Sequence, residues 1–176
     1  MENIDPRYKS VLSIAGSDSG GCAGIQADIK SISACGAYVA TVITVTTAQN
    51  TMGVTDIHAI PISHLEMQLD AVLSDIDFGA VKIGMLHSCE VIEVVQHKLS
   101  EYKAMNIVLD PVMVSTSGHK LIADDAIACL KSFLPQVTLI TPNIPEAEIL
   151  IDEKIDSDNM EKMAQKIGER FQVSVL

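Results

Sequence analysis

Short apolar runs rich in β-branched residues alternate along this 176-residue chain with longer segments in which apolar residues recur at helical spacing. The runs predicted as strands are 11–15, 37–47, 80–83, 106–109 and 137–140, and the helices are 24–35, 63–77, 88–102, 123–133, a segment starting at 145, and 160–171. Right-handed β–α–β crossovers then imply a mostly parallel sheet with helices on both sides. The sequence therefore predicts an α/β fold of three layers, in one domain spanning residues 1–176.

Composition and charge agree with this fold class and narrow the choice of partners. Hydrophobic residues make up 48% of the chain and aromatic residues only 3%, which suits strands covered on both faces by helices. A net charge of −11 without clustered Lys and Arg argues against nucleic acid as a partner. No run approaches the roughly 20 apolar residues of a membrane span, and no basic leader begins the chain. We therefore expect small-molecule partners, no membrane contact and a cytoplasmic location.

Four cysteines are spread through the chain at positions 22, 35, 89 and 129. None of the intervals is that of a Cys-x-x-Cys pair or of a His-Cys metal site. We expect reduced, mostly buried thiols.

A glycine-rich turn, Gly16–Gly24, separates the first strand from the first helix. Glycines let main-chain N–H groups approach a ligand closely, and a helix N-terminus carries partial positive charge. The alternative is a tight connection that only requires positive φ angles. The turn matches neither the Walker nor the dinucleotide-binding glycine pattern, so a bound dinucleotide is disfavoured.

Local signals predict three further features. Ser63 and Glu66 have the spacing of a helix capping box. Residues 54–60 read as an edge strand or a flap, and residues 115–118 read as a mobile surface loop.

Five segments distant in sequence converge on one edge of the predicted sheet. Each places a residue just past the carboxyl end of a strand, namely Gly16, Gln49, Met85, Asp110 and Asn143. Ligands of parallel α/β sheets bind at this edge. The convergence is a stronger indication of a binding site than any single motif.

The segments that carry this convergence resemble a known family. They are Ala15–Asp18 with Gly24–Asp28, Ala48–Thr51, Lys82–Leu86, Leu109–Met113 and Thr141–Ala147. In this order they resemble the hydroxymethylpyrimidine and hydroxymethylpyrimidine-phosphate kinases of thiamine biosynthesis, members of the ribokinase-like superfamily. The resemblance covers almost the whole chain, and the related pyridoxine kinases share the fold and some of the motifs. It implies a ribokinase-like α/β/α fold and ATP-dependent phosphorylation of 4-amino-5-hydroxymethyl-2-methylpyrimidine and then of its monophosphate.

The resemblance also assigns an acceptor pocket. Gln49 matches the glutamine that reads the pyrimidine, and Asp28 matches a hydrogen-bond acceptor on the inward side of the first helix. The positions that match close-packed walls are Gly16, Ala23, Met85 and Val112. The alternatives are a loop amide capping backbone groups for Gln49 and ordinary core packing for Met85 and Val112.

Three further residues match the superfamily's Mg²⁺ and ATP network: Asp110, Asn143 and Glu146. In that network the carboxylates of Asp110 and Glu146 act largely through bound water. Alternatively, Asp110 forms a turn and Glu146 is an acid favoured by a helix dipole. Lys82 interrupts an apolar strand and is interpreted as a structural lysine, paired or reaching solvent.

Residues 172–176 look like a strand that enters the sheet. The resemblance places a Lys-Gly-Gly-His segment and a Gly-Thr-Gly-Cys helix start with the catalytic aspartate beyond it. We therefore expect a C-terminally incomplete domain, with no catalytic base within the chain and little or no phosphoryl transfer by these residues alone. A non-catalytic pyrimidine- or vitamin-binding module, pyridoxine kinase specificity and a homodimer remain open at this point.

Overall fold

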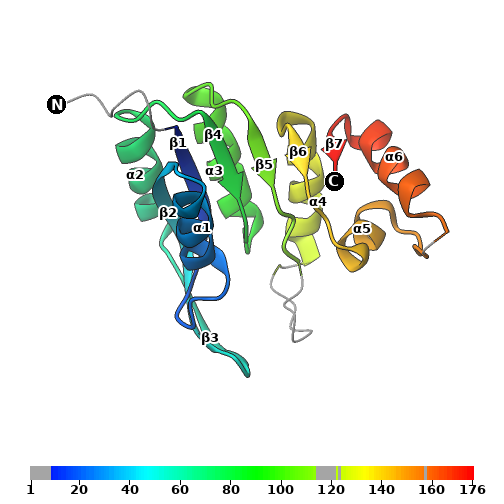
Figure 1. The fold of residues 1–176 in the computed structure, drawn as a ribbon, viewed down its shortest axis with the longest axis horizontal. Helices are drawn as coiled ribbons and strands as arrows, with labels where there is room; N and C mark the ends of the chain where they lie inside the picture. Colours follow the sequence, from blue (N-terminus) through cyan, green and yellow to red (C-terminus); the bar gives the residue numbers. More distant parts are fainter. Residues whose placement is uncertain (1–8, 114–121, 123, 157) are drawn as a thin grey trace.

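The computed structural model describes residues 9–113, 122, 124–156 and 158–176. Its seven-stranded sheet has the order β3-β2-β1-β4-β5-β6-β7, and every neighbouring pair is parallel except β2 with β3 (Figure 1). The strands are β1 (Ser10–Asp18), β2 (Tyr38–Asn50), β3 (Gly53–Ala59), β4 (Ala80–Ile83), β5 (Ile107–Leu109), β6 (Leu139–Ile140) and β7 (Ser174–Val175). The helices are α1 (Gly24–Ala34), α2 (Ile62–Leu73), α3 (Cys89–Glu101), α4 (Asp124–Phe133), the 3₁₀ turn η1 (Leu134–Gln136), α5 (Ile144–Ile151) and α6 (Met160–Phe171).

Helices cover both faces of this sheet. Helix α1 lies across β1 and β2 on one face, while α2, α3 and α4 lie side by side on the other (Figure 1). The side chains between the layers are mostly aliphatic, and the fully buried ones include Leu12, Ile14, Leu69, Ile83, Leu109 and Phe133. The predicted three-layer α/β/α architecture is confirmed, and so is the predominantly parallel sheet.

The chain changes direction in the sheet at β1. From β1 it passes through α1 to β2 on one side, and from β3 it returns through α2 to β4 on the other side. Where the connections of two neighbouring strands lie on opposite faces of the sheet, a crevice opens at the carboxyl ends of these strands, and α/β proteins bind ligands there. The topology therefore places a crevice above the carboxyl ends of β1 and β4.

Two strands are longer than the sequence predicted. Gly16 lies inside β1 and Gln49 lies inside β2, so neither follows the end of its strand. Both lie at register shifts, one between Ala15 and Ser17 and the other between Ala48 and Gln49. Such bulges re-aim the local side chains and twist the strand, and they occur often beside binding sites.

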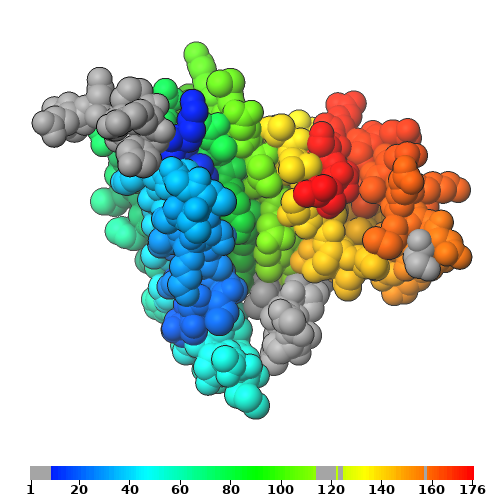
Figure 2. Space-filling view, viewed as in Figure 1, coloured from blue at the N-terminus to red at the C-terminus, as the bar shows by residue number. Residues whose placement is uncertain are grey.

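Strand β3 confirms the predicted edge strand. It pairs antiparallel with β2, and the two form a hairpin that projects from the body of the molecule (Figure 2, cyan). The predicted capping box at Ser63 and Glu66 is wrong, because α2 begins at Ile62 with Pro61 at its N-cap and no side chain caps it. The predicted mobile loop at 115–118 lies outside the described residues.

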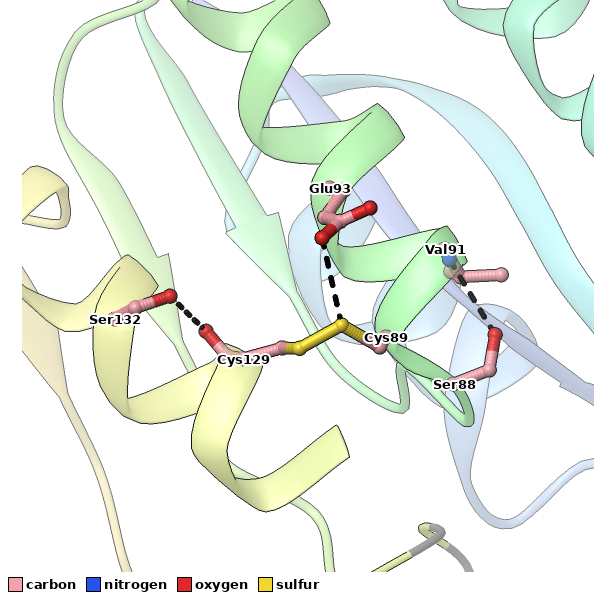
Figure 3. The surroundings of a disulfide bond; sticks show 6 residues. All are labelled: Ser88, Cys89, Val91, Glu93, Cys129 and Ser132. Carbon is pink, nitrogen blue, oxygen red and sulfur yellow. Dashed lines mark hydrogen bonds between the residues drawn. A yellow bond between two sulfur atoms is a disulfide. The ribbon is translucent and has the colours of Figure 1, made fainter. Parts of the chain in front are cut away.

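The expectation of reduced, mostly buried thiols is also wrong, because two of the cysteines form a disulfide and the two free ones are exposed. Cys89, the first residue of α3, forms a disulfide with Cys129 of α4, with the two Cα atoms 5.5 Å apart (Figure 3). Cys22 and Cys35 are free and exposed. Spacing along the sequence did not reveal the pair because packing of α3 against α4 brings the two residues together.

Within the part of the chain that the structure describes, every helix is too short or too polar to cross a bilayer.

Candidate functional site

A cavity of about 390 Å³ opens at the carboxyl ends of β1 and β4. All nine residues that the sequence analysis assigned to a site line it: Gly16, Ala23, Asp28, Gln49, Met85, Asp110, Val112, Asn143 and Glu146. They come from β1, the β1–α1 turn, α1, β2, the segments that follow β4, β5 and β6, and α5. The predicted convergence of distant segments is therefore seen in the structure.

The glycine-rich turn is organised around the carboxylate of Asp18, the last residue of β1. Its Oδ1 accepts a hydrogen bond from the Gly20 amide at 2.8 Å, and its Oδ2 accepts from the Cys22 and Ala23 amides at 2.9 Å each. Burial by itself would raise the pKa of Asp18, but these amide donors outweigh it and hold the pKa below its ordinary value. The amides that a bound anion would need are already used, so the turn is a wall of the cavity and not an anion cradle.

Gly24 closes this turn against the preceding strand. Its φ angle is +54°, and a Cβ built on it would lie 2.2 Å from the Gly16 carbonyl oxygen. Gln26 then fastens the junction, because its Oε1 accepts from the Asp18 amide at 2.8 Å and its Nε2 donates to Ser17 Oγ at 2.8 Å. The strand-to-helix connection is thus fixed by backbone geometry and by one amide side chain.

Gln49 is anchored through its main chain, and only the Oε1 atom of its side chain has a hydrogen-bond partner among the described residues. Ser19 Oγ donates to the Gln49 carbonyl at 2.7 Å and accepts from the Gln49 amide at 2.8 Å. Thr47 Oγ1 lies 3.1 Å from Gln49 Oε1, and the described residues provide no hydrogen-bond partner for Nε2. The side-chain NH₂ can therefore donate to a ligand in the cavity.

Asp28 lies on the inner side of α1, where two other elements hold its carboxylate. Ser13 Oγ of β1 donates to Oδ2 at 2.6 Å, and the Lys82 ammonium of β4 lies 3.0 Å from each carboxylate oxygen. The interpretation of Lys82 as a paired lysine is confirmed. The pair nevertheless lines the cavity, which the sequence analysis did not predict for Lys82.

The Met85 and Gly16 segments form a close-packed wall. Thr44 Oγ1 donates to the Met85 carbonyl at 2.9 Å, which holds the loop after β4 against β2. A Cβ on Gly16 would lie 2.9 Å from Val45 Cγ2 and 3.7 Å from Met85 Sδ. Position 16 therefore has no room for a side chain while these neighbours keep their places.

The opposite side of the cavity carries two carboxylates close together, Asp110 and Glu146. Burial raises the pKa of Asp110; the nearby Lys82 charge lowers it and the Asp28 charge raises it. Burial also raises the pKa of Glu146, against hydrogen bonds from Asn143 and Met113, and the charge of Asp110 raises it further. Two partly dehydrated carboxylates that each resist ionisation form an environment that favours a bound cation.

Glu146 has a structural role that the sequence analysis did not assign. It is the third residue of α5, and its Oε2 accepts from the Asn143 amide at 3.0 Å while Asn143 Oδ1 accepts from the Glu146 amide at 3.0 Å. Its Oε1 also accepts from the Met113 amide at 3.3 Å. This reciprocal cap fixes the start of α5 beside Asp110, whose carboxylate has no hydrogen-bond or ion-pair partner among the described residues.

Sequence reasoning missed several residues of the cavity, among them Asp18 and Lys82. For Lys82 a signal was present in the sequence. A lysine two positions before a glycine on a strand shares a face with it, so the lysine side chain can run over the glycine toward the carboxyl edge. For Asp18 the signal was weaker, since an acid in a glycine-rich turn also forms ordinary turns.

The chain matches the family model described as phosphomethylpyrimidine kinase over residues 18–176. It is 49% identical over 144 residues to the hydroxymethylpyrimidine/phosphomethylpyrimidine kinase of Escherichia coli, covering 81% of this chain and 54% of that protein. It is also 49% identical over 160 residues to a thiamine biosynthesis bifunctional protein of Geobacter sulfurreducens, covering 90% of this chain and 33% of that protein. The chain thus spans between a third and about half of the length of these relatives.

Two solved structures have the same fold. The phosphomethylpyrimidine kinase of Clostridium difficile superposes with a TM-score of 0.86 at 43% identity, covering 92% of this chain and 71% of that one. The pyridoxal kinase of Bacillus subtilis, solved as an ADP complex, gives 0.84 at 32% identity, covering 93% and 63%. The family match covers nearly the whole chain and includes the cavity residues from Asp18 onward, and we therefore assign the chain to the phosphomethylpyrimidine kinase family.

Proposed function

We propose that this chain carries the acceptor-binding half of a kinase that transfers a phosphoryl group from ATP to 4-amino-5-hydroxymethyl-2-methylpyrimidine and to its monophosphate. The observation that carries the proposal is the cavity itself, which gathers all nine residues that motif matching assigned to the site. Its volume of about 390 Å³ lies in the range of small-molecule sites, roughly 300–1,000 Å³. Membership of the family supplies the type of reaction.

The acceptor is bound between Gln49 and Asp28 in this proposal. The free NH₂ of Gln49 donates to a ring nitrogen, and the Asp28 carboxylate accepts from the exocyclic amine. Gly16, Met85 and Val112 pack against the ring. The cavity excludes water from the acceptor and orients its hydroxymethyl group, which is the main protein contribution to a phosphoryl transfer.

Asp110 and Glu146 form the face on which Mg²⁺ would be held. Hard carboxylate oxygens are the ligands that Mg²⁺ prefers. Burial raises the pKa of both groups, and a neighbouring carboxylate adds to the shift in each case. When bound, Mg²⁺ supplies neutralisation of charge on phosphate oxygens. Glu146 keeps its place through the α5 cap, while the Asp110 carboxylate, which has no hydrogen-bond partner among the described residues, would face the ion or its water shell.

Binding by these 176 residues is tested by calorimetric titration with 4-amino-5-hydroxymethyl-2-methylpyrimidine. We expect saturable binding, and Gln49→Ala weakens it about tenfold because one buried hydrogen bond and its desolvated partner are lost. Gln96→Ala on α3, outside the cavity, is the matched control and keeps the affinity of the unaltered chain. Equal affinity of Gln49→Ala and the unaltered chain would contradict the proposed pocket.

Catalysis is tested separately with a coupled ATP assay on the same polypeptide. We expect binding without appreciable turnover, because the resemblance assigns the anion-binding helix start and the base to residues that are not among these 176. Turnover at about 1–100 per second, as in ordinary kinases, would contradict this expectation. Binding that Mg-ATP leaves unaffected would favour the non-catalytic module instead.

The likeness to pyridoxal kinases favours a second substrate class. One such relative from Staphylococcus aureus was solved with pyridoxal and superposes on this chain with a TM-score of 0.81 at 31% identity. The same titration with pyridoxal distinguishes the two acceptors. We expect the aminopyrimidine to bind more tightly, and tighter pyridoxal binding would move the assignment to the other class.

We also propose a cytoplasmic homodimer. Strand β3 is the edge strand of the described sheet and exposes Ile57, and the adjoining turn exposes Met52. A second copy of the chain would cover this apolar edge. Sedimentation of the unaltered chain and of Ile57→Lys, together with cell fractionation, tests both statements. A monomer at micromolar concentration would contradict the dimer.

A further inference from the structure

Lys82 is the only cationic side chain among the described residues that line the cavity. It shares this space with the carboxylates of Asp18, Asp28, Asp110 and Glu146. Main-chain amides already satisfy Asp18, which leaves Asp28, Asp110 and Glu146 for the single ammonium. Burial raises the pKa of Asp110 and of Glu146. Of the three carboxylates the ammonium contacts Asp28 directly, at 3.0 Å from both oxygens.

Gly84 creates the path by which this ammonium reaches Asp28. Lys82 and Gly84 are two residues apart and therefore share one face at the end of β4 and its extension. A Cβ built on Gly84 would lie 3.0 Å from Lys82 Nζ and 3.1 Å from Ala15 Cβ, both closer than ordinary contact. The missing side chain leaves the ammonium room to lie over Gly84, next to the carboxylate.

Two donors from two strands hold the Asp28 carboxylate. Ser13 Oγ on β1 binds Oδ2 at 2.6 Å and Lys82 on β4 spans both oxygens, while Asp28 itself comes from α1. The Lys82 and Asp28 side chains keep 27% and 14% of their exposure, so the pair forms part of the cavity wall and is not sealed in the core. A carboxylate that is hydrogen-bonded and ion-paired in this way presents its remaining lone pairs to a ligand in one fixed direction only.

We propose that Lys82 is a positioning residue that orients the Asp28 carboxylate toward the amino group of the acceptor, and that Gly84 is required for it to do so. The inference rests on the proposed acceptor pocket and goes beyond it, because Lys82 affects the ligand indirectly, by orienting Asp28. A lysine that only balanced charge within the fold would affect stability and would not distinguish between ligands.

The test is calorimetric titration of Lys82→Met, Asp28→Asn and the double variant. The two probes are 4-amino-5-hydroxymethyl-2-methylpyrimidine and the analogue that lacks the 4-amino group. We expect Lys82→Met to weaken binding of the amino compound about tenfold, as for loss of a charge-assisted contact, and to change binding of the deamino analogue less than twofold. In the Asp28→Asn background Lys82→Met should have no further effect on binding of the amino compound.

Gly84→Ala tests the path without removing the charge. We expect it to weaken binding of the amino compound about threefold, because the new methyl group displaces the ammonium by a few tenths of an ångström. Lys98→Met is the matched control. The Lys98 ammonium lies 2.8 Å from Asp70 Oδ1, and neither residue lines the cavity. We therefore expect Lys98→Met to affect stability and to leave the affinity for both probes unchanged.

The outcomes separate the two proposals. If the unaltered chain binds the amino compound but Lys82→Met weakens both probes equally, or adds its full effect to Asp28→Asn, the positioning role is overturned and the pocket stands. If the unaltered chain binds neither probe, the proposed function is overturned and this inference with it. The inference is supported if both Lys82→Met and Lys98→Met lower the midpoint of urea unfolding, but only Lys82→Met loses the preference for the amino compound over the deamino analogue.

Discussion

The two sides of the cavity differ in how their aspartates are held. On the side of β1 and α1, three main-chain amides surround Asp18, and Ser13 with Lys82 holds Asp28. On the side of β5 and α5, burial raises the pKa of Asp110, which has no hydrogen-bond partner among the described residues. The carboxylates of the first side are held by donors of the protein itself, whereas a cation would stabilise the ionised form of Asp110 on the second side.

The difference follows from what each backbone segment offers. A glycine-rich turn at a helix N-terminus presents several unpaired N–H groups, which a nearby acid can accept from. The segment after β5 runs into Pro111, which has no amide hydrogen to donate. The side of β1 and α1, where we propose that the pyrimidine binds, is therefore held by the protein's own donors, while the side of Asp110, where we propose that the metal binds, responds to ions and pH.

The largest expected effect is on the side of β1 and α1, from Gly24→Ala. The added Cβ would lie 2.2 Å from the Gly16 carbonyl, at a φ angle of +54°, so the turn must rearrange. We expect the free energy of unfolding in urea to fall by about 4 kcal/mol. Gly36→Ala is the control, because its φ is +78° but nothing lies within 4 Å, and it should lose only about 1 kcal/mol. Equal losses would show that the contact with Gly16 is unimportant.

The second-largest expected effect concerns the disulfide that links helices α3 and α4. Cys89 begins α3 after the Met85 loop, and Cys129 lies on α4 after the Val112 segment (Figure 3). The bond closes a loop of 40 residues, so Cys89→Ser should lower stability by about 3 kcal/mol without reductant. Dithiothreitol should bring the unaltered chain to the same value, and Cys22→Ser should change nothing. If the unaltered chain unfolds identically with and without reductant, the cross-link does not form in solution.

Asp18→Asn tests whether the amides of the turn depend on a negative charge. We expect a loss of about 2 kcal/mol at pH 7, as for charge-assisted hydrogen bonds. Because the pKa of Asp18 is lowered in the folded state, its contribution is present above the unfolded value of 3.8 and is lost as the pH falls through the folded pKa. The stabilities of the variant and the unaltered chain should therefore converge below about pH 4. A difference that persists unchanged at pH 2 would contradict this origin.

Asp110→Asn should have the smallest effect and the opposite sign. A raised pKa means that the ionised folded state is penalised above that pKa and that the penalty disappears as the pH falls below the unfolded value of 3.8. We expect the variant to be more stable than the unaltered chain by about 1 kcal/mol at pH 7 without metal. Millimolar Mg²⁺ should stabilise only the unaltered chain. If Asp110→Asn is less stable at pH 7, the two sides do not differ as described.

Much of the fold and of the site could be predicted because it depends on local patterns. Periodicity located β4 without error and α1, α3 and α6 within a residue or two, and the rule that ligands bind at carboxyl ends brought Gln49, Met85 and Asp110 to one edge. The errors arose where the outcome depends on neighbours. The capping box at Ser63 failed because Pro61 sets an earlier helix start, and the strand ends at Gly16 and Gln49 were missed because bulges extend the pairing.

By itself the sequence determined the order of strands and helices, the parallel sheet and the edge at which the site lies, since hydrophobic spacing and turn residues act over a few positions. Only the tertiary structure decided which charges meet and which thiols join. Lys82 pairs with Asp28 from 54 residues away, Asp18 takes up the amides that an anion would have used, and Cys89 reaches Cys129 across two packed helices. These contacts depend on how strands and helices lie against one another, because packing of distant segments sets distances that no local pattern encodes.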